Sequence, residues 1–182
     1  TDNLEKRAKF LLNNRLTNAS SIFAVAKEEQ SELIKNKSYT IPKYDKKILI
    51  KEASLFCDWY AKKHLSKNNK NEFSKKFKKI IKHLTLNLKL KNSFFVHRDF
   101  HVSNLMLVKN RIGVIDSQDA LIGNRAYDLA SLIDDVRLKT SKSFKKKVYN
   151  FYVQKQKKLE KHKFKNDFEI LSILRNFKII GI

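Results

Sequence analysis

Apolar and polar positions follow one another along most of this chain with the spacing of amphipathic α-helices. Apolar side chains recur every three or four residues, which places them on one face of a helix. This spacing predicts helices over residues 4–35, 45–65, 72–89, 126–138, 141–161 and 167–180. In the second of these, the predicted inward face consists of Ile48, Leu49, Ala53, Phe56, Trp59 and Tyr60.

Between residues 93 and 115 the pattern changes to short apolar runs. Residues 93–96 form the first run, and residues 105–108 and 112–115 form two more on either side of a polar turn. Two short apolar runs that flank a polar turn are typical of a β-hairpin. We therefore expect a mostly α-helical chain with one small β-hairpin at its centre.

The composition excludes several classes of protein. The single cysteine cannot build a disulfide framework or a cysteine-based zinc site, which favours a reducing, cytoplasmic location. No apolar run approaches the ~18 residues of a membrane helix, so no membrane partner is expected. The 42% hydrophobic content is too high for a disordered polybasic tail. The 182 residues are enough for one domain.

All three glycines lie late in the chain, at Gly113, Gly123 and Gly181. No Gly-rich phosphate-binding loop of either common pattern is therefore present. The sequence begins on a polar stretch at Thr1 and ends inside an apolar run. Because natural termini are usually polar and loosely held, we expect this chain to be a segment of a longer protein.

The formal net charge of +22 suggests a nucleic-acid partner, because phosphate backbones attract clustered Lys and Arg. However, 33 of the basic residues are Lys and only 7 are Arg, the residue that bidentate phosphate recognition prefers. Residues 94–136 carry a net charge of −2, while the rest of the chain carries +24. We interpret the charge as solvated lysine faces and do not expect nucleic acid to be the partner. A basic nucleic-acid-binding domain remains the alternative from a different class.

A group of polar residues with a shared chemistry lies inside this acidic segment. His97, Arg98 and Asp99 directly follow the first apolar run. Asn104 comes five residues after Asp99, and Asp116 closes the second strand of the predicted hairpin. In phosphoryl transfer, one Asp orients the attacking hydroxyl, while an Asn and a second Asp hold the Mg²⁺ that bridges the nucleotide phosphates. The spacing therefore indicates a phosphotransferase site.

The segments around these residues resemble the aminoglycoside-phosphotransferase-like kinases. The matching segments are HRDFHVSNLM at 97–106, IDSQDA at 115–120 and AYDLASL at 126–132. Three more segments are similar to one branch, the bacterial cell-wall amino-sugar kinases, which phosphorylate N-acetylmuramate and N-acetylglucosamine at the anomeric hydroxyl. These are IPKYD at 41–45, LFCDWY at 55–60 and LRNFKIIGI at 174–182.

The resemblance implies the C-terminal lobe of a protein-kinase-like α+β fold, without the N-terminal β-rich lobe. Residues 1–182 are expected to form this single lobe, with the catalytic loop and metal hairpin at 94–120. Helices at 40–90 and 125–182 are expected to flank it. Because the other lobe supplies part of the nucleotide site, we expect this segment alone to bind nucleotide poorly and to be inactive.

The resemblance also implies an ATP- and Mg²⁺-dependent kinase that acts on a small sugar in cell-wall recycling. Asp99 is the expected catalytic base, and Asn104 and Asp116 are the expected Mg²⁺ ligands. Other acceptors on the same fold, such as an aminoglycoside, choline or fructosamine, remain open. A pseudokinase also remains open if the other lobe lacks its lysine.

Four residues are expected to support this set. His97 and Asp128 are expected to orient the catalytic loop. His101 and Asp119 are candidate contacts to the substrate or the phosphates, or else local hydrogen-bonding residues.

Three residues of the predicted 45–65 helix complete the expectations. Glu52 and Asp58 either touch a substrate or, by default, lie on the helix surface. Cys57 is expected to be a small buried hydrophobic residue.

Overall fold

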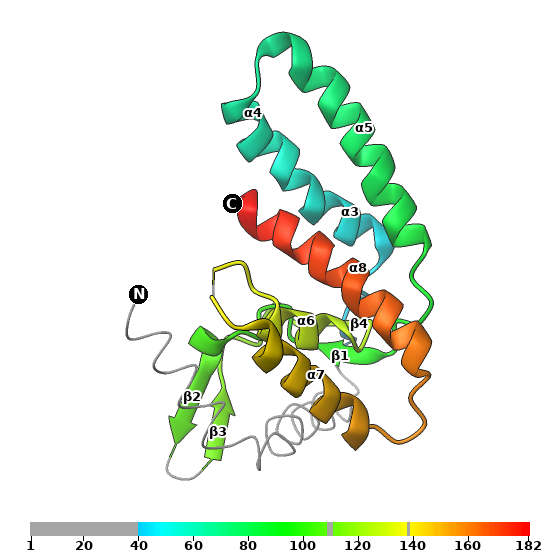
Figure 1. The fold of residues 1–182 in the computed structure, drawn as a ribbon, viewed down its shortest axis with the longest axis vertical. Helices are drawn as coiled ribbons and strands as arrows, with labels where there is room; N and C mark the ends of the chain where they lie inside the picture. The colour runs from blue at the N-terminus through cyan, green and yellow to red at the C-terminus, as the bar shows by residue number, and fades with distance from the viewer. Residues whose placement is uncertain (1–39, 109–110, 138) are drawn as a thin grey trace.

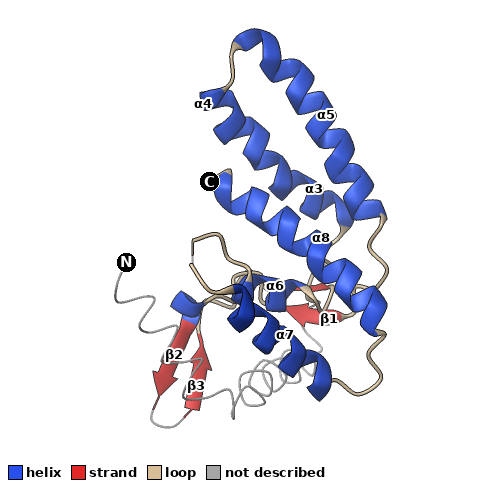
Figure 2. Cartoon of the chain, in the orientation of Figure 1, coloured by secondary structure: helices blue, strands red, loops and turns tan. Residues whose placement is uncertain are grey.

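The computed structural model describes residues 40–182 except 109–110 and 138, so the helix predicted over 4–35 lies outside the described residues. Its helices are α3 (Lys46–Leu55), α4 (Lys62–His64), α5 (Lys67–Leu86), α6 (Tyr127–Ile133), α7 (Lys142–Lys155) and α8 (Lys161–Ile180). Its strands are β1 (Phe94–Val96), β2 (Leu105–Val108), β3 (Arg111–Val114) and β4 (Leu121–Gly123). Helix dominates this arrangement, as Figure 2 shows, and the predicted mostly helical fold is confirmed.

Helices α3, α5 and α8 lie side by side in the upper part of Figure 1, and the strands, α6 and α7 lie below them. A cluster of aromatic rings holds the three upper helices together. The ring of Phe56 lies 5.3 Å from that of Phe77 on α5 and 5.0 Å from that of Phe177 on α8, between centroids. Phe77 and Phe177 also meet edge to face at 4.8 Å. Such ring pairs stabilise a core beyond the area that they bury.

The helix predicted over 45–65 exists, but a π-helical turn over Phe56–Ala61 interrupts it. Asp45 caps its N-terminus, because an Asp45 carboxylate oxygen accepts a hydrogen bond from the Ile48 backbone N–H at 2.9 Å. A π turn adds one residue to the helix and rotates the following side chains by roughly 100°. The prediction that Trp59 and Tyr60 face inward is therefore wrong: they are 68% and 44% exposed. Cys57 is buried, as expected.

Glycine at position 181 lets the end of α8 press against the junction between α3 and the π turn. A Cβ atom there would lie 2.4 Å from the backbone carbon of Leu55 and 2.4 Å from the backbone nitrogen of Phe56. No side chain fits at that distance from backbone atoms. The close approach fixes where α8 ends relative to α3.

Two small antiparallel sheets form in the lower part of the molecule. The predicted hairpin is confirmed, with β2 paired to β3 in the register Leu105↔Val114. The pairing of β1 with β4, in the register Phe94↔Gly123, was not predicted. The segment before α3 joins this second sheet, because the Tyr44 backbone N–H donates to the Ile122 carbonyl at 2.8 Å. This sheet anchors the start of the loop at 97–104.

The helix predicted over 126–138 is shorter than expected and ends at Ile133. Asp134, directly after the helix, makes tertiary contacts instead. It accepts hydrogen bonds from Lys145 on α7 and Ser172 on α8. The chain therefore leaves the helix before Val136, which is 50% exposed.

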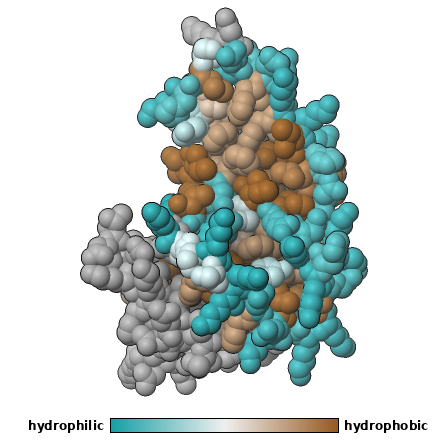
Figure 3. Space-filling view, in the orientation of Figure 1, coloured by the Kyte–Doolittle hydropathy of each residue, from teal (hydrophilic) through white to brown (hydrophobic). Residues whose placement is uncertain are grey.

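The upper helices present a hydrophobic surface with hydrophilic side chains at its rim, as Figure 3 shows. Trp59 and Tyr60, which are 68% and 44% exposed, belong to the exposed hydrophobic residues of the molecule. Within residues 40–182, as far as they are described, we find no helix that combines the length and the apolar character needed to cross a bilayer.

The close packing at Gly181 generates a first prediction. Replacing Gly181 with Ala should destabilise the protein by roughly 1–3 kcal/mol, because the added methyl group overlaps the backbone of α3. This cost exceeds the ~0.4–1 kcal/mol gained by restricting the unfolded chain. Thermal unfolding measures the effect as a lower Tm. Lys165→Ala, at an exposed position of the same helix, is the control, and an equal Tm for both variants would contradict the packing account.

Candidate active site

A carboxylate on α6 holds the backbone of the candidate catalytic loop at 97–104. Asp128 accepts hydrogen bonds from the backbone N–H of His97 at 2.8 Å and of Arg98 at 3.2 Å. Burial raises the pKa of Asp128 to about 6, although these two N–H groups act in the opposite direction. Arg98 has a φ of 72°, a left-handed conformation that costs free energy outside glycine. The two hydrogen bonds help to hold the loop in this conformation.

The Arg98 side chain ties the same loop to α3 through Glu52. An Arg98 guanidinium nitrogen donates to one carboxylate oxygen of Glu52, and the Tyr44 hydroxyl donates to the other. Lys178 on α8 lies 3.5 Å from the same carboxylate. Glu52 therefore does not lie on the helix surface, the default expectation: its side chain is only 12% exposed and paired from three directions.

Tyr44 completes the surroundings of Arg98. The Arg98 guanidinium lies 5.4 Å from the centroid of the Tyr44 ring, within the range of a cation–π contact. Burial raises the pKa of Tyr44 well above its ordinary value, with further contributions from Tyr127 and Glu52. Tyr44 thus stays a neutral hydrogen-bond donor to Glu52.

Arg98 also reaches the segment after the hairpin. Its second terminal nitrogen donates to the backbone carbonyl of Asp119 at 3.0 Å. Asp119 itself is exposed, and its carbonyl rather than its carboxylate meets the loop. One guanidinium therefore links α3, the catalytic loop and the segment that follows Asp116.

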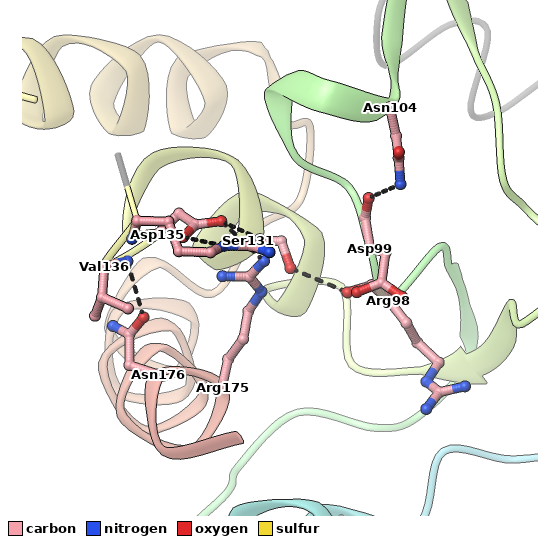
Figure 4. A network of polar contacts seen from close by, with 9 residues as sticks. Arg98, Asp99, Asn104, Ser131, Asp135, Val136, Arg175 and Asn176 are labelled. Atoms are coloured by element: carbon pink, nitrogen blue, oxygen red, sulfur yellow. Dashed lines mark hydrogen bonds and ion pairs between the residues drawn. The ribbon is translucent and has the colours of Figure 1, made fainter. Parts of the chain in front are cut away.

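Asp99 and Asn104 belong to one tight turn, shown in Figure 4. The Asn104 side-chain amide donates to the Asp99 carbonyl at 2.9 Å, and the His101 backbone N–H donates to the same carbonyl at 2.9 Å. Ser131 on α6 donates to the Arg98 carbonyl at 3.3 Å and supports the turn from the side of α6. The half-buried Asp99 carboxylate receives no hydrogen bond from the described residues. It is free to accept one from a bound molecule.

The hairpin brings Asp116 back to this turn. The Ile115 backbone N–H donates to the Asn104 carbonyl at 3.0 Å, and the buried His97 ring donates to the Ile115 carbonyl at 3.0 Å. Asp116 follows with a φ of 72° and an exposed side chain. This backbone contact places Asn104 opposite Ile115, the residue directly before Asp116.

The chemistry of Asn104 and Asp116 fits Mg²⁺. Because the Asn104 amide nitrogen is used by the Asp99 carbonyl, its side-chain oxygen is left for a ligand. Gln118 donates to one carboxylate oxygen of Asp116 at 2.8 Å and leaves the other available. In the described part of the chain, no three His, Cys, Asp or Glu side chains gather to hold a metal ion. An amide and one carboxylate suit Mg²⁺, which takes few protein ligands and completes its shell with phosphates and water.

His101 lies beside two arginines that sequence analysis did not connect with the site. Burial, together with the charges of Arg137 and Arg175, lowers the pKa of the half-buried His101. Neither arginine stands in the polar motif, and they are far from it in sequence. Their position near Asp99 arises only from the packing of α6 against α8.

The known proteins that resemble this chain are phosphotransferases and sugar kinases. A family described as "Phosphotransferase enzyme family" matches residues 38–156. An N-acetylmuramate/N-acetylglucosamine kinase of Neisseria meningitidis is 31% identical over 148 residues, which cover 78% of this chain and 44% of the relative. The kinase of the same name from Pseudomonas aeruginosa is 39% identical over 95 residues, or 52% of this chain and 28% of the relative. The chain thus spans less than half the length of these relatives.

The contacts of Glu52 generate a second prediction. Glu52→Gln should destabilise the protein by about 2 kcal/mol, because it leaves two largely buried cations without a counter-charge. Chemical denaturation measures the loss. Glu72→Gln removes a carboxylate from an exposed ion pair with Lys76 and should change stability by less than about 0.5 kcal/mol. Equal losses of stability in the two variants would show that the Glu52 contacts stabilise the protein no more than an exposed ion pair does.

Proposed function

Because the chain belongs to the phosphotransferase enzyme family, we propose that it forms the C-terminal lobe of an ATP-dependent small-molecule kinase. The observation that carries this proposal is the hydrogen-bonded turn that joins Asp99, Asn104 and the residue before Asp116. It gathers a free carboxylate and two oxygen ligands for Mg²⁺ in one place. The remaining nucleotide contacts are proposed to come from a part of the protein outside these residues.

In the proposed reaction, Asp99 is the general base. Its carboxylate accepts the hydrogen bond of the acceptor hydroxyl, orients the oxygen toward the γ-phosphorus of ATP and takes its proton as the phosphoryl group transfers. Asn104 and Asp116 would hold Mg²⁺, which would supply positive charge to neutralise the charge that develops on the phosphates. The Asp128 carboxylate and the Glu52–Arg98 pair keep the loop in the conformation that presents Asp99.

We propose the anomeric hydroxyl of N-acetylmuramate or N-acetylglucosamine as the acceptor. The names of the matching relatives support this substrate class, as does the likeness at 41–45, 55–60 and 174–182. The product is a sugar 1-phosphate, which a nucleotidyl transfer reaction can consume. Choline, an aminoglycoside or a fructosamine as the acceptor would change the substrate but not the roles of Asp99, Asn104 and Asp116.

The role of Asp99 is tested by Asp99→Asn in the full-length protein. The variant should keep its fold and lose at least about 100-fold in kcat for ATP-dependent sugar phosphorylation, because the amide cannot accept the proton. A coupled assay of ADP release in the presence of each sugar measures the loss. Glu72→Gln, at an exposed position of α5, is the control and should retain activity. Retained activity in Asp99→Asn would remove Asp99 from its role.

The role of Asp116 is tested through the magnesium requirement. Asp116→Asn should raise the Mg²⁺ concentration that gives half-maximal activity by roughly tenfold, because a charged ligand becomes a neutral one. The same titration of Glu72→Gln should match the unmodified protein. If Asp116→Asn lowers kcat with no change in the Mg²⁺ requirement, Asp116 is not a metal ligand.

A further inference from the structure

Two arginines share one buried carboxylate near the turn that holds Asp99 and Asn104 (the catalytic turn). Arg137, which follows α6, donates to Asp135 from its backbone N–H at 2.9 Å, from Nε at 2.9 Å and from a terminal nitrogen at 2.6 Å. Arg175 on α8 donates to Asp135 at 3.3 Å. Asn176 fixes the same segment to α8, because its side-chain oxygen accepts the Val136 backbone N–H at 3.3 Å. The segment after α6 and helix α8 therefore both contribute residues to this cluster.

One carboxylate cannot satisfy both guanidinium groups. Burial raises the pKa of Asp135, but the hydrogen bonds from Arg137 and the charge of Arg175 bring it down to about 2, so it stays ionised. The cluster still carries one net positive charge. The Arg175 side chain is only 2% exposed, and its second terminal nitrogen is buried with no acceptor among the described residues. A buried cationic donor without an acceptor is costly and favours an anion beside it.

The cluster lies near the turn that carries Asp99. In Figure 4, Asp135 and Arg175 lie together beside Ser131, which donates to the Arg98 carbonyl next to Asp99 at 3.3 Å. Asp99 is also near enough to raise the pKa of Arg137, after the larger effect of Asp135. An acceptor whose hydroxyl meets Asp99 therefore lies close to the charge of Arg137.

We propose that Arg137 binds a carboxylate of the acceptor sugar, with the positive charge of Arg175 behind it, and thereby distinguishes N-acetylmuramate from N-acetylglucosamine. This proposal rests on the proposed function. The two sugars differ by the lactyl ether of N-acetylmuramate, whose carboxylate is the one negative charge that N-acetylglucosamine lacks. Arg137, with its side chain 52% exposed, is the group that a ligand can reach, and the buried Arg175 lies behind it. A guanidinium and a carboxylate form short, charge-assisted hydrogen bonds.

The test compares the two sugars on the same full-length protein. Arg137→Gln should lower the ratio of kcat/KM for N-acetylmuramate to kcat/KM for N-acetylglucosamine by roughly tenfold, because a charge-assisted hydrogen bond is lost for one sugar alone. Arg137→Lys keeps the charge and should restore part of the ratio. Lys146→Gln removes a positive charge at an exposed position of α7 and should leave the ratio unchanged.

Each outcome decides the proposal. The proposal is supported if the ratio of kcat/KM values for the two sugars falls because the KM for N-acetylmuramate alone rises. Equal losses for both sugars would mean that Arg137 is structural and would overturn it, as would a higher KM for ATP with either sugar, since the anion would then be a phosphate. Both of these results leave the kinase function standing. A protein that phosphorylates neither sugar in its unmodified form overturns the proposed acceptor and this proposal together.

Discussion

The contacts of the Glu52 carboxylate are the interactions on which the geometry of the catalytic turn most depends. The carboxylate is largely buried on α3 and receives Arg98 from the catalytic loop, Tyr44 from the segment before α3 and Lys178 from α8. A guanidinium held this far from water needs a counter-charge. The contact therefore fixes the distance between the upper helices and the loop, and Arg98 passes the constraint on to the carbonyl of Asp119. Helices, loop and hairpin are positioned by one group.

The catalytic turn stores conformational strain that the surrounding packing supports. Arg98 and Asp116 both adopt a φ of 72°, a region that costs of order 1–2 kcal/mol for residues with a Cβ. Asp128 holds the first through two backbone N–H groups, and the contacts of Ile115 with Asn104 and His97 hold the residue before the second. Such strain occurs where a side chain must be presented to a ligand. The strained positions flank the group proposed to act on the substrate.

The sequence predicted those parts of the fold that depend on local spacing. Helical periodicity identified the helices of residues 40–182, and two apolar runs around a polar turn identified the hairpin. The short separation of Asp99 from Asn104 indicated one loop. Contacts between distant residues had no such signal: Glu52 and Arg98 are 46 residues apart, and Asp135 and Arg175 are 40 apart. The pairing of β1 with β4 was missed because three-residue strands are too short to show a period. Trp59 was misplaced because a π turn changes the helical phase without a sequence mark.

The net positive charge of the chain has no role in the proposed catalysis. The proposed catalytic and metal-binding residues, Asp99, Asn104 and Asp116, lie in residues 94–136, which carry a net charge of −2. The central claim is that phosphate moves from ATP to the anomeric oxygen of an amino sugar. Phosphorus NMR of the full-length protein with ATP, Mg²⁺ and N-acetylmuramate tests it most directly. The account predicts a new phosphomonoester signal that is coupled to the anomeric proton of the sugar. ATP that stays intact, or a signal of inorganic phosphate alone, would contradict it.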